Sequence, residues 1–574
     1  MLKFNRCVAV GVKNVLNNTG IYSISAVNNR VSSVRLFNKS CPERQISPKV
    51  AEECPANVQK GKERIEESDP TCHVSRAVWE KAKPFKQMPG PKALPIIGNT
   101  WRFLPKIGEY YKMEVNDFLT IMRKQFGDII KLDGVIGLPN AVYLLSPEDI
   151  ETIYKQESVI PERDILPSMT YFRDNMRQEV FENSKGLLTS GGQDWYTFRN
   201  KVNSIMMQPK MVKQYVKPVD VIATDFCEKI KRMRDADGKM GDIIMNETNK
   251  WALESIAALA LDARLGCLSD NLPADSIPQQ MVQNAQDVFA IGEKMDFEPS
   301  IWKYYATPTY KKAMKLYDDQ LNLAQTHIGA AIENIKKKKE SGVKAEEHQE
   351  ISVLEKLLDI DPKVAVVMVS DMLLAGIDTT STAFVNILYH LANNKDKQDK
   401  LREEIAALLP NRSSELKASH LNQLPYLKAC IKEAARIYPV TPGTMRILTK
   451  DTVLSGYRIP KGTNVIFVHM FISILEEQFP RPLEYIPERW LRENVDSEIF
   501  YKNAHPFSTM HFGFGPRSCI GRRFAELELE VVLVNFIRHF DISWDGPPPK
   551  KATTSINYLK GPFNFVFKDS TLSN

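Results

Sequence analysis

The sequence feature that most constrains this chain is a single cysteine in a glycine-rich loop. Residues 512–521 read F-G-F-G-P-R-S-C-I-G, and a helical pattern follows them directly. The glycines Gly513, Gly515 and Gly521 permit close approach of the backbone, whose N–H groups can spread the charge of a thiolate at Cys519. The dipole of the following helix also favours negative charge there. An isolated cysteine is usually a small buried apolar residue, but this loop predicts a thiolate ligand for haem iron.

A long apolar segment predicts a buried helix in the second half of the chain. The run from Val364 to Asn393 is apolar almost all round, and Asp361 and Pro362 suit the N-cap and first turn of a helix. A membrane span is the alternative. Because polar and ionisable residues within the run would be costly in lipid, we expect a core helix instead.

Inside this expected helix, residues 375–380 read A-G-I-D-T-T. Gly376 lacks a side chain, which would leave room for a small ligand beside the helix. Thr379 can bond back onto its own helix, which is the ordinary role of a threonine in this position. The neighbouring acid favours a second role, in which Asp378 and Thr379 relay protons.

Two further motifs place a pair of functional side chains on one helix face. They are Glu433-A-A-Arg436, with a spacing of three residues, and Trp195-Y-T-F-Arg199, with a spacing of four. Taken alone, such pairs are usually surface features. Their order along the chain relative to the cysteine loop indicates functional or core positions instead.

The loop pattern F-x-x-G-x-R-x-C-x-G, together with these motifs in this order, resembles the cytochrome P-450 family of haem-thiolate monooxygenases. The resemblance extends from about Pro89 to the C-terminus. It implies a mainly α fold with small β-sheets, in which a triangular helical domain surrounds a buried haem b. It also implies that Cys519 ligates the iron within a loop that includes Phe512, Gly513 and Gly521. One departure is His511, where relatives often carry proline.

The resemblance assigns roles to the remaining motif residues. Asp378 and Thr379 match the catalytic positions of the oxygen-activation motif. Glu433 and Arg436 would form a buried structural triad with Arg489 of the sequence P-E-R-W. The side chains expected at the haem propionates are those of Arg517, Trp195, Arg199 and Arg446.

Composition excludes several other classes of protein. The net charge of +6 over 574 residues is too small to indicate nucleic-acid binding, and no nucleic-acid motif is present. The eight cysteines are scattered without a C-x-x-C pattern. A zinc site, a disulfide framework and covalent haem attachment are therefore not supported, and reduced thiols indicate an intracellular compartment. No internal repeat divides residues 89–574, which we expect to form one domain.

The N-terminal region has the composition of a mitochondrial transit peptide. Residues 1–42 contain no Asp or Glu, and basic residues recur among serine, asparagine and valine. A disordered basic tail is the alternative. Residues 43–88 are polar and charged, which predicts a linker. The expected location is the mitochondrion, on the matrix side of the inner membrane.

A mitochondrial member of the family would receive electrons from a small acidic [2Fe-2S] ferredoxin, itself reduced by a ferredoxin reductase and NADPH. Lys428 and Lys432 lie four residues apart on the expected E-x-x-R helix. The resemblance places them at positions that contact ferredoxin in mitochondrial relatives. A merely solvated face is the alternative.

The resemblance is nearest to insect mitochondrial members, which implies insertion of one atom of O2 into an apolar small molecule. A xenobiotic is the first expectation and a steroid the second. Substrate contacts are expected from Ile160 to Leu188, from Phe289 to Tyr305 and at the turn around Gly561. The aromatic and basic segment Ile301 to Lys312 would either contact a membrane peripherally or pack inward as a lid. The alternative function is a haem protein that senses a gas or isomerises a substrate without external electrons.

Alternating apolar residues predict strands within Asp128 to Leu145, Val453 to His469, and Ser555 to Phe567 around a turn at Gly561-Pro562. The long segments between them are expected to be helical.

Overall fold

A computed structural model describes residues 76–182, 184–270, 272–340 and 351–571. The predicted transit peptide, residues 1–42, lies outside this part of the chain, as does most of the predicted linker. The helices, including short 3₁₀ turns and one π-helix labelled η, are α2 (Arg76–Lys81), η1 (Phe85–Gln87), η2 (Thr100–Phe103), α3 (Val115–Phe126), α4 (Pro147–Gln156), α5 (Pro167–Asn175), α6 (Gln178–Phe181), α7 (Gly186–Thr189), α8 (Gly192–Met206), α9 (Pro209–Lys213), α10 (Val216–Met233), α11 (Ile243–Leu261), α12 (Ile277–Gly292), η3 (Glu293–Phe297), α13 (Pro308–Glu340), α14 (Val353–Ile360), α15 (Pro362–Ala392), α16 (Lys395–Leu408), α17 (Ala418–Leu421), α18 (Pro425–Ile437), α19 (His469–Ile472), η4 (Pro487–Trp490), η5 (Arg492–Asn494), η6 (Tyr501–Asn503) and α20 (Arg522–His539).

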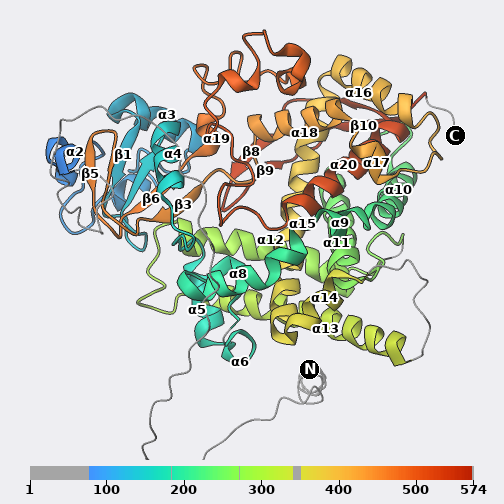
Figure 1. The fold of residues 1–574 in the computed structure, drawn as a ribbon, viewed down its shortest axis with the longest axis horizontal. Coiled ribbons are helices and arrows are strands. Elements are labelled where there is room, and N and C mark those ends of the chain that lie inside the picture. Colours follow the sequence, from blue (N-terminus) through green and yellow to red (C-terminus); the bar gives the residue numbers. More distant parts are fainter. Residues whose placement is uncertain (1–75, 183, 271, 341–350, 572–574) are drawn as a thin grey trace, which may run out of the picture. The chain divides into compact units, whose positions relative to one another are not determined.

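The strands are short and form small sheets. They are β1 (Ile129–Leu132), β2 (Ala141–Leu144), β3 (Thr444–Ile447), β4 (Thr452–Leu454), β5 (Tyr457–Ile459), β6 (Asn464–Phe467), β7 (Phe540–Trp544), β8 (Lys550–Thr553), β9 (Asn557–Lys560) and β10 (Phe565–Asp569). The four-stranded sheet has the order β1-β2-β6-β3, in which only β2 and β6 run parallel. Figure 1 shows its strands beside α3 and α4, which pack against β1 and β2. The predicted mainly α fold with small β-sheets is confirmed.

Helix α15 is the central core element. It begins where expected, because the Asp361 side chain accepts a hydrogen bond from the Lys363 amide at 2.9 Å. It packs against α11, α14, α18 and α20 (Figure 1). Among the described residues it is the one helix long and apolar enough to cross a membrane, yet 78% of its most apolar window is buried within the fold. The prediction of a core helix is therefore confirmed.

The last predicted strand segment folds differently from the expected turn. Residues 555–567 contain β9 and β10, but β9 pairs with β8 and β10 pairs with β7, so the two do not form a hairpin with each other. The reason lies in the connection between them, because the Phe563 amide donates to the Asp242 carboxylate at 2.8 Å rather than to a neighbouring strand. Strands β3, β7 and β8 were not predicted.

The packed domain begins before Pro89. Within the predicted linker, α2 and η1 are ordered elements, and the Lys83 amide donates to the Gly456 carbonyl at 2.9 Å. Met88 is buried in a hydrophobic cluster with residues of the four-stranded sheet.

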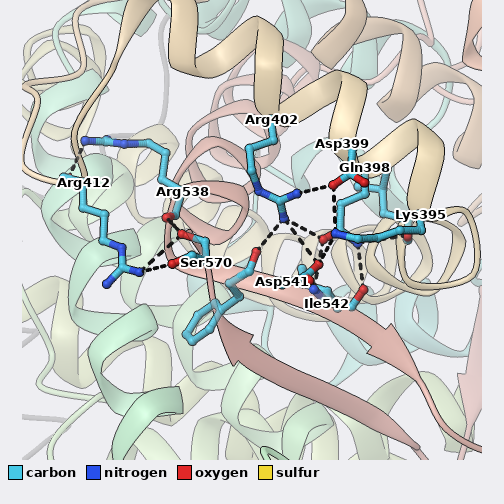
Figure 2. Close-up of polar contacts among 11 residues, drawn as sticks. Lys395, Gln398, Asp399, Arg402, Arg412, Arg538, Asp541, Ile542 and Ser570 are labelled. Carbon is cyan, nitrogen blue, oxygen red and sulfur yellow. Dashed lines mark hydrogen bonds and ion pairs between the residues drawn. The ribbon is translucent and has the colours of Figure 1, made fainter. Parts of the chain in front are cut away.

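The C-terminal end of the domain is held by arginines from α20 and from the segment after α16 (Figure 2). Arg538 Nη2 donates to the carbonyls of Asn411 at 2.6 Å and Ser414 at 2.9 Å. Arg412 Nη2 donates to the Ser570 carbonyl at 2.5 Å, and the Ser570 hydroxyl donates to the Arg538 carbonyl. These contacts fix the segment after β10 and the C-terminal end of α20 against the segment that follows α16.

Candidate functional site

Two glycines give the cysteine loop its shape. Gly513 and Gly515 have φ angles of 70° and 71°, which side chains rarely tolerate. The resulting turn lets the Cys519 amide donate to the Phe512 carbonyl at 2.9 Å. Gly521 differs from the prediction, because it is the N-cap of α20 with an ordinary φ of −82°. The loop therefore needs only two of its three glycines for their backbone freedom.

Cys519 differs from the other described cysteines in its accessibility. Cys227, Cys267 and Cys430 are buried, whereas Cys519 is exposed. Its pKa is nevertheless raised by burial among protein atoms, an effect that the Gly521 amide and Arg199 partly offset. The two observations agree if the thiol is accessible within the folded domain rather than on its outer surface. Burial thus opposes ionisation of the thiol, and the positive charge of a bound iron would favour the thiolate.

Arg517 lies close to the cysteine in sequence and packs on a predicted partner. Its guanidinium carbon is 3.9 Å from the centroid of the Trp195 ring. Nε donates to the Pro161 carbonyl at 3.1 Å and Nη1 to the Ser190 carbonyl at 3.0 Å. Nη2 is buried without a hydrogen-bond partner. Burial, together with other nearby arginines, lowers the pKa of Arg517 to about 8.

Three more arginines complete a cluster that we call the arginine cluster: Arg163, Arg199, Arg446 and Arg517. Burial lowers the pKa of Arg163 to about 10, with Arg446 and Arg199 adding repulsion, and Arg163 Nε has no partner. Arg446 forms an ion pair with Glu157, both almost fully buried. The predicted residues Trp195, Arg199, Arg446 and Arg517 are thus brought together, and Arg163 joins them. Its signal in the sequence was weak, because P-E-R at 161–163 falls in the stretch expected to contact substrate.

The arginine cluster fits the two propionates of haem. Two carboxylates lie close enough to act on it, namely Glu157 and Glu162. Four guanidinium groups against two carboxylates leave a formal excess of two positive charges, in a place where burial makes unpaired cations costly. Partnerless donor atoms on Arg163 and Arg517 would be satisfied by anionic oxygens. The donor set beside Cys519 therefore suits an iron porphyrin with two carboxylate groups.

The predicted catalytic residues lie on α15. Asp378 is buried, its Oδ1 has no hydrogen-bond partner, and burial raises its pKa to about 7. Thr379 Oγ1 donates to the Ala375 carbonyl at 2.6 Å, the bond to its own helix that the sequence allowed. Gly376 differs from the expectation, because an added Cβ would meet Ile256 of α11 at 2.8 Å. That glycine permits close packing of α11 on α15 rather than leaving an open space.

A buried carboxyl behind α15 was not predicted. Glu528 of α20 is almost fully buried, and burial raises its pKa to about 8. It accepts a hydrogen bond from Thr380 Oγ1 at 3.3 Å. The available signal was helical spacing, because Glu528 shares the apolar face of α20 with Phe524 and Val531.

The structure brings the expected triad together with no exposed side-chain surface. Arg436 donates to both oxygens of Glu433 at 2.8 and 2.9 Å, and Arg489 Nε donates to the same carboxylate at 3.1 Å. The Ile486 amide and Trp490 Nε1 also donate to it, at 3.2 and 2.9 Å. Glu433 therefore holds α18 against η4.

The two predicted docking lysines of α18 lie opposite acidic residues of α20. Lys428 Nζ is 3.9 Å from the Glu530 carboxylate. Lys432 is exposed, its Nζ lies 5.9 Å from the Trp490 ring centroid, and partial burial lowers its pKa. Arg522 pairs with Glu526 at 2.9 Å. Glu526 and Glu530 therefore neutralise part of the positive charge that the sequence predicted for this surface.

Comparisons with known proteins show the family to which the chain belongs. Residues 88–567 match the cytochrome P-450 family. The cytochrome P-450 CYP12A2 of Musca domestica is 37% identical over 507 residues, which cover 87% of this chain and 94% of that protein. The probable mitochondrial cytochrome P-450 12a5 of Drosophila melanogaster is 37% identical, covering 86% of this chain and 92% of the relative. The mitochondrial cytochrome P-450 12b1 of Drosophila acanthoptera is 38% identical, covering 83% and 88%. Both the geometry and these relatives lead to one conclusion: the chain belongs to the cytochrome P-450 family of haem-containing monooxygenases.

Proposed function

We propose that this monooxygenase inserts one atom of O2 into a C–H bond of an apolar xenobiotic, with a steroid as the second candidate. The other oxygen atom leaves as water, and two electrons and two protons complete the balance. When bound, haem supplies the iron at which O2 is reduced. The observation that carries the proposal is the arginine cluster with its two excess charges beside the accessible Cys519.

The chain's own residues would divide the work among them. Cys519 would ligate the iron, within the loop that also contains Phe512, Gly513 and Gly521. Arg163, Arg199, Arg446 and Arg517, with Trp195 stacked on Arg517, would hold the propionates. Asp378 has a pKa of about 7, which suits a group that gives and takes protons at neutral pH. Thr379 would turn its hydroxyl from the Ala375 carbonyl toward the proton path.

We further propose that the protein works in the mitochondrion, on the matrix side of the inner membrane. The mitochondrial names of the relatives support the compartment. A [2Fe-2S] ferredoxin, reduced through its reductase by NADPH, would then be the electron donor. Lys432 is the best-placed docking residue because it is exposed, whereas Lys428 lies beside Glu530.

Peripheral membrane contact is the third part of the proposal. The segment Ile301 to Lys312 has one aromatic side chain packed inward and another exposed. Trp302 is buried and donates to the Met295 carbonyl, whereas Tyr304 is 85% exposed. The exposed Ile136 lies near this segment, since its carbonyl accepts from the Ser300 amide at 3.2 Å. Exposed apolar side chains from two separate segments thus face outward together, as an interfacial contact requires.

The test is oxygen consumption by purified protein with ferredoxin, ferredoxin reductase and NADPH. We expect uptake that depends on ferredoxin and a product that carries isotopic oxygen from O2. Cys519→Ser is the control and should lose the thiolate-type spectrum of the reduced carbon monoxide complex. Turnover or signalling that proceeds without any electron donor would instead favour the gas sensor or isomerase.

A further inference from the structure

A second recognition site lies at the surface between α5 and the segment that joins η3 to α13. It is a pocket of about 530 Å³, lined by aromatic side chains of both elements and by Asp164. None of its lining residues belongs to the arginine cluster. Asp164 nevertheless directly follows Arg163 of that cluster, so the two sites are neighbours along the chain.

Three aromatic rings form the wall of this pocket. The Tyr171 ring meets those of Trp302 and Tyr310 edge-on, with centroids 5.9 and 6.0 Å away, and the latter two stack at 6.2 Å. The Trp302 Nε1 donates to the Met295 carbonyl at 2.9 Å, so its polar edge is already satisfied. Trp302 is 8% exposed and one face of its ring stacks on Tyr310, so a ligand meets only the part of the indole face that borders the pocket, and that face attracts cations.

The pocket also contains a carboxylate that lacks a partner. Asp164 makes no ion pair within 4.0 Å among the described residues, and partial burial raises its pKa while Lys303 lowers it. Asp164 is exposed, and a carboxylate that borders aromatic faces is a favourable place for a positive charge. The chain supplies one such charge itself, because Lys303 Nζ is 5.8 Å from the Trp302 ring centroid.

A buried network fixes the two walls relative to each other. Asp296 in η3 accepts hydrogen bonds from the Ser168 amide at 3.0 Å and from the Ser168 hydroxyl at 2.6 Å. That hydroxyl also lies 2.8 Å from Tyr317 Oη in α13. Helix α5 is thus tied to η3 and α13, and the aromatic wall is formed before any ligand arrives.

We propose that this pocket binds an organic ammonium group with an apolar body, held over the Trp302 and Tyr171 rings beside Asp164, with the Lys303 side chain displaced. The inference rests on the proposed function, in which it makes soluble aromatic or alicyclic amines a substrate class of the enzyme. The ring faces would recognise the charge and the apolar body together, which an ordinary ion pair with a carboxylate would not.

The experiment titrates the haem-loaded protein with phenyltrimethylammonium and with its uncharged isostere tert-butylbenzene, using calorimetry without any electron donor. We expect the cation to bind more tightly than the isostere. Asp164→Asn should weaken the cation about three- to tenfold and leave the isostere unchanged. Lys303→Gln should strengthen cation binding by about two- to threefold, because the competing charge is gone. Trp302→Leu should reduce the preference for the cation.

Glu298→Gln is the matched control, because Glu298 is an exposed acid of the same segment that does not line the pocket. Equal binding of the two probes, or equal loss in Asp164→Asn and Glu298→Gln, would overturn the proposal. A haem absorption shift on binding of the cation that the pocket variants leave intact would overturn it too. Displacement of the cation by phosphatidylcholine vesicles would overturn the assignment to soluble amines in favour of lipid headgroups. If the probes behave as expected but ferredoxin-dependent oxygen uptake is absent, the pocket stands and only the proposed function fails.

Discussion

Two groups of buried arginines in this protein differ in how their charge is balanced. Arg436 and Arg489 share the Glu433 carboxylate at 2.8–3.1 Å and have no exposed side-chain surface. In the arginine cluster, among the described residues, only Arg446 pairs directly with a carboxylate, that of Glu157, and Arg163 and Arg517 have buried donor atoms without partners. In the first group both guanidinium groups bond directly to a carboxylate of the chain, so the chain itself supplies the anion, although Arg489 Nη1 has no partner. In the second group three of the four arginines form no ion pair with a carboxylate among the described residues, and we propose that an external anion completes it. The same residue type then marks architecture in one place and a binding site in the other.

The largest effect on stability should come from removing the charge of Glu433, which Arg436 and Arg489 share. Glu433→Gln leaves two buried guanidinium groups without their shared anion, and we expect a loss of about 3–5 kcal/mol in the free energy of unfolding. The loss should be the same with and without haem, as measured by denaturant unfolding. A variant that is stable but only poor at retaining haem would place Glu433 in the binding site instead.

Removing a member of the arginine cluster should instead weaken haem retention and leave the stability of the haem-free protein nearly unchanged. In Arg517→Leu we expect haem retention to fall about ten- to hundredfold, the worth of lost charge-assisted hydrogen bonds. The stability of the haem-free protein should change by less than about 1 kcal/mol, because relief of repulsion from Arg163 and Arg446 offsets the lost hydrogen bonds to the Pro161 and Ser190 carbonyls. Haem transfer to a scavenger protein measures the first quantity and chemical unfolding the second. Arg517→Lys, which keeps the charge but not the planar fork, should be intermediate. Equal destabilisation with and without haem would remove the distinction between the two groups.

Asp378 extends the comparison to a buried acid. Its carboxyl has no ion-pair partner among the described residues, just as most guanidinium groups of the arginine cluster have none. Burial raises its pKa to about 7 in the fold, so its ionisation costs stability increasingly as pH rises toward that value. Asp378→Asn should therefore raise stability at pH 8 relative to the parent and leave it unchanged at pH 3. If Asp378 delivers protons, turnover should fall about tenfold and lose its pH dependence near 7. A variant with unchanged stability at both pH values would contradict the raised pKa.

Charge reversal on the surface should have a smaller and salt-sensitive effect. Lys432→Glu should slow reduction by ferredoxin about three- to tenfold at low ionic strength, and the loss should shrink as salt rises. Lys428→Glu should do less, because Glu530 already offsets Lys428 at 3.9 Å. Stopped-flow reduction kinetics measure both, with Lys86→Glu as a reversal on an exposed residue of η1. Equal effects of the Lys86 and Lys432 reversals would mean that docking occurs elsewhere.

The smallest effect concerns the acid opposite these lysines. Burial raises the pKa of Glu530 to about 7, with Lys428 acting in the other direction. Below that pH Glu530 is neutral and the surface is more positive; above it the carboxylate weakens attraction of an acidic partner. Glu530→Gln should therefore speed reduction about two- to threefold at pH 8 and leave it unchanged at pH 6. Persistence of the same pH step in the variant would assign it to another group.

The sequence was most informative where chemistry depends on local spacing. The pairs Trp195/Arg199 and Glu433/Arg436 each share a helix face, which their spacing dictates whatever the rest of the chain does. Helix α15 was equally predictable, because its apolar composition and the N-cap Asp361 are local properties.

Contacts between residues far apart in the chain could not be predicted from the sequence. Nothing near Arg163 in the sequence says that Arg446, almost three hundred residues away, shares its surroundings. Similarly, the space beside Gly376 is filled by Ile256 of another helix, and the partners of β9 and β10 are strands that no local pattern selects. Local spacing therefore identified the members of the site but not the balance of charge among them.

The hydrogen bonds that Ser570 forms with Arg412 and Arg538 have a consequence for how the protein folds during synthesis. Strand β10 is synthesised after the other elements of the domain, and its Phe567 packs against the rings of Phe536 and Phe540 at centroid distances of 6.1 and 5.5 Å. A chain that stops at Lys560 leaves those rings open and deprives Arg412 of its carbonyl partner in Ser570. Whether the polypeptide leaves a ribosome or is threaded into an organelle, β10 arrives after the rest of the domain. Completion of the fold is thereby coupled to the arrival of β10, so copies that terminate before it expose apolar surface that cellular proteases recognise.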